Sequence, residues 1–125
     1  MALVAAADAN LCAAERAARM RYSVAILGFA LVLIVAMTEL GVALPYRALI
    51  ALPLFASALQ LTQACSGVCI FHARAGTRTT GGVVEPVMDP RQRIRVAKRA
   101  REVFVGAAMM SAVTTGIVLV VAYLG

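Results

Sequence analysis

The sequence predicts an all-α integral membrane protein, a single domain of 125 residues with three transmembrane helices arranged as a helical hairpin plus one long helix. Apolar residues make up 62% of the chain and charged residues 14%, and the mean hydropathy is +0.89. Soluble domains contain roughly 45–50% apolar residues, so a membrane is the expected solvent. The basic residues lie at the ends of apolar runs instead of alternating with aromatic residues on a polar surface, which argues against a nucleic-acid partner.

The chain begins with an alanine-rich segment, residues 1–21, that is basic at its end. We expect a short cytoplasmic helix on the membrane surface, capped by Asp8 and supported by Glu15 four residues before Arg19. The first span follows over residues 22–43, where VAILGFALVLIVAM carries no polar side chain. Extending this run to residues 22–43 supplies the about 20 residues that a span requires and encloses Thr38 and Glu39. No A-x-A cleavage site directly follows the first span, and further spans come after it, so we expect an uncleaved signal anchor.

The second span is predicted over residues 46–72, separated from the first by only a few residues. Pro45 suits the first turn of this helix, because its missing N–H would have no partner there in any case. The two spans therefore form a tight antiparallel hairpin. Residues 73–89 collect glycine, proline and hydroxyl side chains, a composition typical of a loop, and we place this loop in the cytoplasm.

A long third helix is predicted from Pro90 to Leu124. Asp89 followed by Pro90 is a helix-start signal, and nothing after it interrupts the helical pattern. At 1.5 Å per residue the helix would be about 52 Å long, whereas the hydrocarbon core of a bilayer is about 30 Å thick. We therefore expect residues 90–102 to form a basic helical extension outside the membrane and residues 103–124 to form the third span.

The orientation follows from the basic residues. Eleven of the twelve precede the first span or lie between the second and third, and only Arg47 lies next to the first link, at the start of the second span. The positive-inside rule then predicts a cytoplasmic N-terminus and a C-terminus on the opposite side of the membrane. We expect a multi-pass protein of a bacterial inner (cytoplasmic) membrane, so that opposite side is the periplasm. One side of the basic extension is expected to contact anionic lipid headgroups or an acidic partner protein, through Arg91, Arg95, Lys98 and Arg99.

Cys65, Cys69 and His72 are the candidate metal ligands. At positions i, i+4 and i+7 they share one face of a continuous helix, and thiolates with an imidazole suit copper or zinc. Three ligands on one helix leave a tetrahedral site incomplete, however, and C-x3-C-x2-H is not a usual zinc spacing. The same residues also fit plain helix packing. We expect no cofactor, with copper or zinc as the alternative.

The same stretch resembles a known family. Gly67-Val68-Cys69 followed by Gly76-Thr77 is similar to the G-x-C-P…G-[IT] signature of a short two-helix inner-membrane module of unknown function, often fused to or encoded beside rhodanese-type sulfurtransferases. The N…ER…R…G entry to that module's first helix resembles Asn10, Glu15, Arg16, Arg19 and Gly28. The resemblance covers about residues 10–78, omits the third span, and departs from the family at Ile70, where the family has proline, and at His72, where it has an aromatic residue. It implies that Cys69 acts near sulfur or thiol metabolism.

Glu39 is the one carboxylate inside a predicted span. An ionisable group within the membrane indicates a functional site, such as a proton or cation relay. Glu39 lies near the outer end of its span, however, a short link away from Arg47, so an ion pair at the membrane surface is the favoured interpretation.

Two further sets of residues are predicted to pack helices together. Gln60 and Gln63 make the second span polar, and such side chains form hydrogen bonds between helices in lipid. On the third span, small residues repeat every four positions and allow close approach of a partner helix, in this chain or another, at Ala108, Ala112 and Gly116.

Recognisable catalytic motifs are absent from the sequence, and the polar segments are too short to enclose a substrate. We therefore expect a non-catalytic accessory or assembly subunit of a larger inner-membrane complex, in contact with the lipid bilayer and with other membrane subunits or copies of itself. One alternative is a carrier of soft metal ions or sulfur species that uses Cys65, Cys69 and His72. A second is an oligomeric ion or proton channel that involves Glu39.

Overall fold

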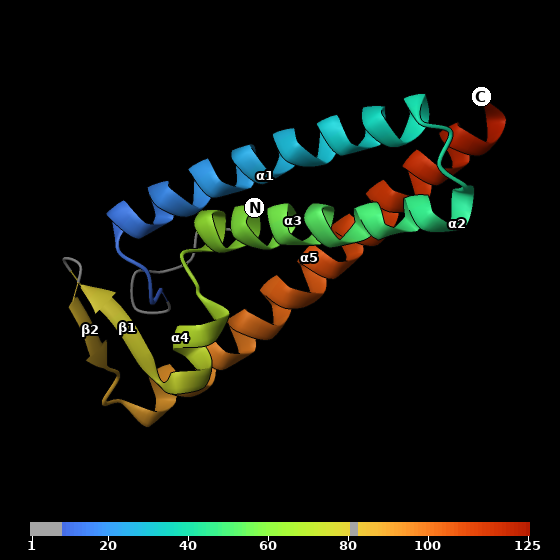
Figure 1. Cartoon of the computed structure of the whole chain (residues 1–125). Coiled ribbons are helices and arrows are strands. Elements are labelled where there is room, and N and C mark those ends of the chain that lie inside the picture. The colour runs from blue at the N-terminus through green and yellow to red at the C-terminus, as the bar shows by residue number, and fades with distance from the viewer. Residues whose placement is uncertain (1–8, 81–82) are drawn as a thin grey trace.

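The computed structural model describes residues 9–80 and 83–125. Within this part of the chain, three long helices dominate the architecture, α1 (Ala13–Glu39), α3 (Ala51–Ser66) and α5 (Pro90–Leu124) (Figure 1). Helices α1 and α5, and the helical segment Leu44–Ser66 that contains α3, are long and apolar enough to cross a membrane. The prediction of a helical, multi-pass membrane protein is confirmed to this extent.

Helix α3 is the centre of the molecule. It packs against both α1 and α5, whereas α1 and α5 have little direct contact with each other within the described residues (Figure 1). On the α1 side, Ala30 is fully buried against Ile50 and Leu54. On the α5 side, the rings of Phe55 and Phe104 meet edge to face with their centroids 5.5 Å apart, an arrangement that aromatic pairs prefer. The three helices therefore form an open layer around α3, not a closed bundle.

The first link is short, as predicted. Helix α1 ends at Glu39, four residues before the predicted limit of the span, and α2 (Leu44–Arg47) begins with Pro45 in its first turn. A turn of 3-10 helix, η2 (Ala48–Ile50), then leads directly into α3. The antiparallel hairpin predicted for the first two spans is therefore present.

The second predicted helix was wrong in its last part. Helix α3 ends at Ser66 because Gly67 adopts a left-handed conformation with φ of 70°, and the Gly67 N–H donates to the carbonyl of Gln63 at 2.9 Å. Glycine reaches this conformation without the steric cost that a Cβ imposes, and it commonly ends helices in this way. After a short extended segment the chain forms a separate helix, α4 (Ile70–Ala75), so the predicted continuous helix over residues 46–72 does not exist.

The predicted loop of residues 73–89 contains regular structure. Strands β1 (Thr77–Thr80) and β2 (Val83–Pro86) pair in antiparallel fashion, so the all-α class needs correction for a small two-stranded sheet. Threonine and valine favour extended backbone because their branched side chains suit a pleated surface. Arg78 lies opposite Glu85 in the register, and their charged groups are 3.7 Å apart.

The N-terminal segment also differs from the prediction. Helix α1 begins at Ala13 and continues without a break into the first span, so no boundary separates a surface helix from the span at residue 21. Ala13 to Arg21 contain no glycine or proline, so nothing ends the helix there. The predicted cap Asp8 lies outside the described residues.

The start of α5 is confirmed. The Asp89 carboxylate accepts a hydrogen bond from the Arg91 N–H at 3.0 Å, and Pro90 opens the helix. Such a cap satisfies one of the N–H groups that the first turn leaves without an intrahelical partner. The first turns of α5 then pack beneath α4, where Val96 and Ala100 are buried against Val68.

We predict that Gly67→Ala destabilises the protein, whereas Gly116→Ala does not. An alanine at Gly67 would be forced into a left-handed conformation at a cost of about 1–2 kcal/mol. Gly116 is helical, and a Cβ there would meet nothing within 4 Å, so its replacement should leave the free energy of unfolding unchanged or raise it by about 0.5–1 kcal/mol. Unfolding by SDS titration in mixed micelles measures both. Equal stability of the two variants would contradict the assigned role of Gly67.

Candidate functional site

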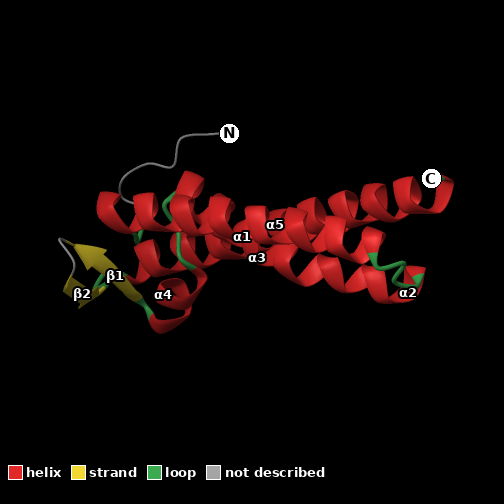
Figure 2. Ribbon diagram, turned by 45° about the horizontal axis from the view of Figure 1, so that its top comes forward, coloured by secondary structure: helices red, strands yellow, loops and turns green. Residues whose placement is uncertain are grey.

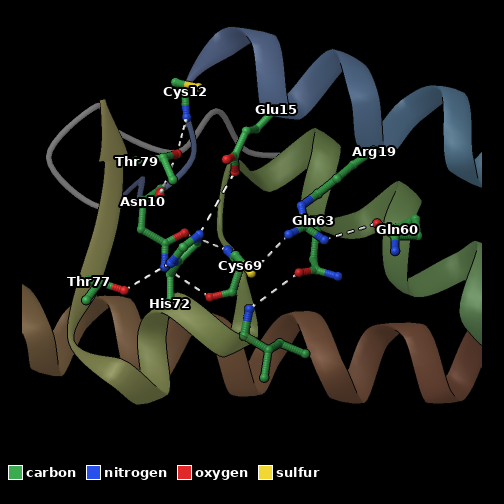
Figure 3. Close-up of polar contacts among 11 residues, drawn as sticks. Asn10, Cys12, Glu15, Arg19, Gln60, Gln63, Cys69, His72, Thr77 and Thr79 are labelled. Atoms are coloured by element: carbon green, nitrogen blue, oxygen red, sulfur yellow. Dashed lines mark hydrogen bonds and ion pairs between the residues drawn. The ribbon is translucent and has the colours of Figure 1, made fainter. Parts of the chain in front are cut away.

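The polar contacts of the molecule concentrate at one end, which we call the β-hairpin end. It comprises α4, β1 and β2, the first turns of α1 and α5, and the last turn of α3 (Figure 2). Here α1 and α3 meet the chain that follows the break at Gly67, and a network of hydrogen bonds surrounds Asn10 and Cys69 (Figure 3). This network is the most elaborate polar arrangement in the described residues.

Asn10 is the centre of the network. Its side chain is 1% exposed and bonds to both backbone groups of Cys69: the amide Nδ2 donates to the Cys69 carbonyl at 3.0 Å, and Oδ1 accepts from the Cys69 N–H at 2.6 Å. The backbone N–H groups of Asn10 and Leu11 both donate to the carbonyl of Gly67, at 3.0 and 3.1 Å. The segment before α1 therefore satisfies the buried backbone where α3 ends.

The same segment also joins the β-hairpin to α1. The Thr79 N–H donates to the carbonyl of Asn10 at 3.0 Å, so residue 10 lies against β1. The hydroxyl of Thr79, in turn, accepts from the Cys12 N–H at 3.1 Å. Cys12 is the residue that precedes α1, and Thr79 supplies an acceptor for its backbone N–H from 67 residues away.

Two arginines on successive turns of α1 reach toward α3. Arg16 donates through Nε to the carbonyl of Ala64 at 2.9 Å and through Nη2 to that of Cys65 at 3.1 Å. These are among the last carbonyls of α3, where a cation also interacts favourably with the helix dipole. Arg19 donates to Gln60 Oε1 at 3.1 Å and to the sulfur of Cys69 at 3.2 Å. Both arginines therefore link helices instead of only facing lipid headgroups.

Gln63 and His72 complete the network. Gln63 is 1% exposed, donates to the Leu59 carbonyl at 3.2 Å and accepts from the Ile70 N–H at 3.4 Å, so it bridges the end of α3 and the start of α4. His72 Nδ1 lies 2.9 Å from the Thr77 hydroxyl, and His72 Nε2 lies 4.0 Å from a carboxylate oxygen of Glu15. The second contact becomes an ion pair when the imidazole is protonated, and it ties α4 to α1.

The predicted metal ligands are not assembled into a site. Because α3 ends at Gly67, Cys65 belongs to α3 whereas His72 belongs to α4, and the common helical face on which the prediction rested does not exist. Cys69 is buried between them, and the imidazole of His72 is directed to Thr77 and Glu15 (Figure 3). Across residues 9–80 and 83–125, no three His, Cys, Asp or Glu side chains lie close enough to hold a metal ion.

Glu39 and Arg47 lie at the opposite end of the molecule. Glu39 is the last residue of α1 and is exposed. Arg47 donates through Nε to the carbonyl of Val42 at 2.7 Å, which closes the link between α1 and α2. No ion pair joins Glu39 to Arg47 in the described part of the chain, so the expected pair is replaced by a bond from Arg47 to the backbone.

The stripe predicted on α5 lies beside the face that packs on α3. Ala112 and Gly116 are exposed and Ala108 is half-buried. The buried positions come one residue earlier, at Ala107, Ser111 and Thr115, and the Ser111 hydroxyl donates to the carbonyl of Ala51 at 3.0 Å. Both stripes repeat small residues every four positions, so the spacing alone did not identify the one that faces α3. Among the basic residues of the extension, Arg99 pairs with Glu102 at 3.1 Å, and Arg91, Arg95 and Lys98 are exposed.

One contact between α1 and α3 was missed by sequence reasoning. The hydroxyls of Ser23 and Ser57 each donate to the other residue's carbonyl at 2.9 Å, and both side chains are buried. The signal in the sequence was a serine at the start of the first apolar run and another inside the second, because a polar side chain in lipid needs a partner from a neighbouring helix.

Asn10→Ala should open the network. The substitution leaves the buried N–H and carbonyl of Cys69 without their partners, at a cost of about 1–3 kcal/mol. In a Cys12→Ser, Cys65→Ser background, we expect the thiol of Cys69 to react slowly with maleimide in the parent and much faster after Asn10→Ala. Thr80→Ala, an exposed change on the neighbouring strand, is the control. An unchanged labelling rate in the Asn10 variant would remove Asn10 from the centre of the network.

The serine pair should show energetic coupling. In a double-mutant cycle of Ser23→Ala and Ser57→Ala, we expect a coupling free energy of about 0.6–1.7 kcal/mol, the range found for hydrogen bonds between helices in membranes. Thr114 bonds to its own helix, so a cycle of Ser23→Ala with Thr114→Ala should be additive within about 0.5 kcal/mol. Additivity in the serine cycle would show that the bonds do not stabilise the α1–α3 contact.

Most residues that carry the sequence resemblance meet at the β-hairpin end. The network includes the backbone or side chains of Asn10, Glu15, Arg16, Arg19, Gly67, Cys69 and Thr77. Gly28 lies apart from them on α1, and a Cβ there would meet nothing within 4 Å. Comparison with models of known protein families, with curated protein sequences and with solved structures gives no match to this chain.

Proposed function

We propose that the chain is a non-catalytic accessory or assembly subunit of a larger complex in a bacterial inner membrane. The β-hairpin end and the N-terminus lie in the cytoplasm, and the C-terminus lies in the periplasm. The single observation that carries the proposal is the pair of exposed small residues on α5, Ala112 and Gly116, on a helix that already uses a parallel stripe of small residues to approach α3. A second helix can approach this free face closely.

The open layer of helices supports the same role. Because α1 and α5 pack on α3 but hardly on each other, both outer helices keep broad apolar surfaces, with Val32 69% and Val121 63% exposed. Lipid covers such surfaces in a monomer, and partner helices cover them in a complex. On the cytoplasmic side, the β-hairpin end holds the helices in fixed relative positions, since its hydrogen bonds join α1, α3, α4 and the sheet.

The two alternative functions have less support. A carrier of soft metal ions or sulfur species needs ligands that the cargo can reach, whereas Cys69 is 1% exposed and bonded to Arg19. An oligomeric ion or proton channel that depends on Glu39 needs this carboxylate along a pore, whereas Glu39 is the last residue of α1 and lies at the very end of the span. The accessory role requires neither site.

Extraction from native membranes tests the proposal. After solubilisation in mild detergent, native mass spectrometry should find the chain in a heavy assembly with at least one other membrane protein. Ala112→Leu with Gly116→Leu should release it as a single chain, because the larger side chains prevent close helix approach. Val113→Leu with Ile117→Leu, two exposed positions on the same helix, should leave the assembly intact.

Two results would overturn the proposal. A parent chain that is purely monomeric and without co-purifying protein would remove the accessory role. A heavy species made only of copies of this chain would replace it with a homo-oligomer. If the Ala112 and Gly116 variant instead keeps its partners, the contact face lies elsewhere on the layer.

A further inference from the structure

A groove runs between α4 and α5 where α5 passes from its basic to its apolar part. It has a volume of about 500 Å³ and lies beside the small core of Val68, Val96 and Ala100. Its residues come from the two helices only, Ile70, Ala73, Arg74, Ala97, Arg101 and Phe104 among them. Alanine side chains consist of a single methyl group and leave space between the two helices. The groove therefore results from small side chains where α4 and α5 cross.

Two arginines lie at the edge of this apolar groove. Arg74 in the last turn of α4 and Arg101 in α5 are both exposed, and neither forms a hydrogen bond or ion pair with another residue in the described ranges. The nearest acidic residue along α5, Glu102, pairs with Arg99 at 3.1 Å. Within residues 9–80 and 83–125, two cationic side chains without a protein partner therefore border one groove whose lining is otherwise apolar.

The groove also continues into the apolar surface of α5. No charged residue follows Glu102 in the sequence, so Arg101 marks the level at which α5 enters its apolar part. Val105 lines the groove, and Met109 and Val113 continue from it at successive four-residue steps, each more than half exposed. Residues four apart lie on one face of a helix, so an apolar track leads from the arginines along α5.

We propose that this groove binds the headgroup of one anionic phospholipid, with its phosphate between Arg74 and Arg101 and an acyl chain along Val105, Met109 and Val113. A phosphate is matched by guanidinium groups, which donate pairs of hydrogen bonds to its oxygens. An acidic protein would pair with the two arginines but would not cover the apolar residues that lead from them along α5. A free phosphate would bind the arginines and would not contact these apolar residues either. The lipid is therefore the ligand that fits charge and shape together. The site is separate from the exposed residues Arg91, Arg95 and Lys98 farther along the basic extension.

Lipid binding to the purified, delipidated chain tests the site. Native mass spectrometry in mixed micelles should show one phosphatidylglycerol bound in preference to phosphatidylcholine. Arg74→Gln with Arg101→Gln should weaken phosphatidylglycerol binding roughly thirtyfold, because each basic residue near a headgroup contributes about a factor of five. The control Arg21→Gln with Arg78→Gln removes the same charge at two positions that do not line the groove and should change the affinity by less than about threefold.

A second variant tests the shape of the groove. Ala97→Leu fills the groove with a larger side chain and keeps both arginines, so it should also abolish the preference for phosphatidylglycerol. If the double arginine variant fails to fold, this variant tests the proposal instead. Slow maleimide labelling of Cys69 reports an intact β-hairpin end in each variant. Equal losses in the two double variants, equal binding of both lipids, or displacement of the lipid by soluble polyglutamate would overturn the proposal.

Discussion

The structure depends on which groups form hydrogen bonds with the backbone where α3 ends. The last turn of a helix leaves carbonyl groups without intrahelical partners, and each such group that is buried and unpaired costs about 1–3 kcal/mol. Here the carbonyls of Ala64 and Cys65 accept from Arg16, and that of Gly67 accepts from the N–H groups of Asn10 and Leu11. The chain can leave α3 and turn back toward α5 only because the start of α1 supplies these partners.

This one requirement determines several neighbouring contacts. The groups that donate hydrogen bonds to the backbone at the end of α3 belong to α1 and to the residues just before it. The same bonds therefore fix the distance between the first turn of α1 and the last turn of α3. Asn10 then uses its own carbonyl to hold Thr79, which brings the β-hairpin against α1. Arg19 and Gln60 repeat the link one turn farther along. Few hydrogen bonds at the β-hairpin end can therefore be removed without affecting the others.

The sequence predicted the long elements well and this junction poorly, for physical reasons. Apolar length identifies a span, and the cap of α5 is formed by adjacent residues, so both are local signals. The interactions that stabilise the end of α3 are not local, because the hydrogen-bond partners of Cys65 and Cys69 lie 49 and 59 residues away in the sequence. The spacing of Cys65, Cys69 and His72 also fits a continuous helix, so it gave no indication that the helix ends before Cys69. The sequence did contain one local sign of it, a glycine followed by the β-branched Val68.

The two ends of the helical layer are held by different forces. At the β-hairpin end, hydrogen bonds from Asn10, Arg16 and Arg19 cross between elements. At the other end a second groove of about 500 Å³ separates α1 from the end of α5, lined mainly by apolar residues such as Ile34 and Val121. Apolar contacts between helices gain little in lipid, because the lipid tails are equally apolar. The contact between α1 and the end of α5 therefore stabilises the layer less than the hydrogen bonds of the β-hairpin end do.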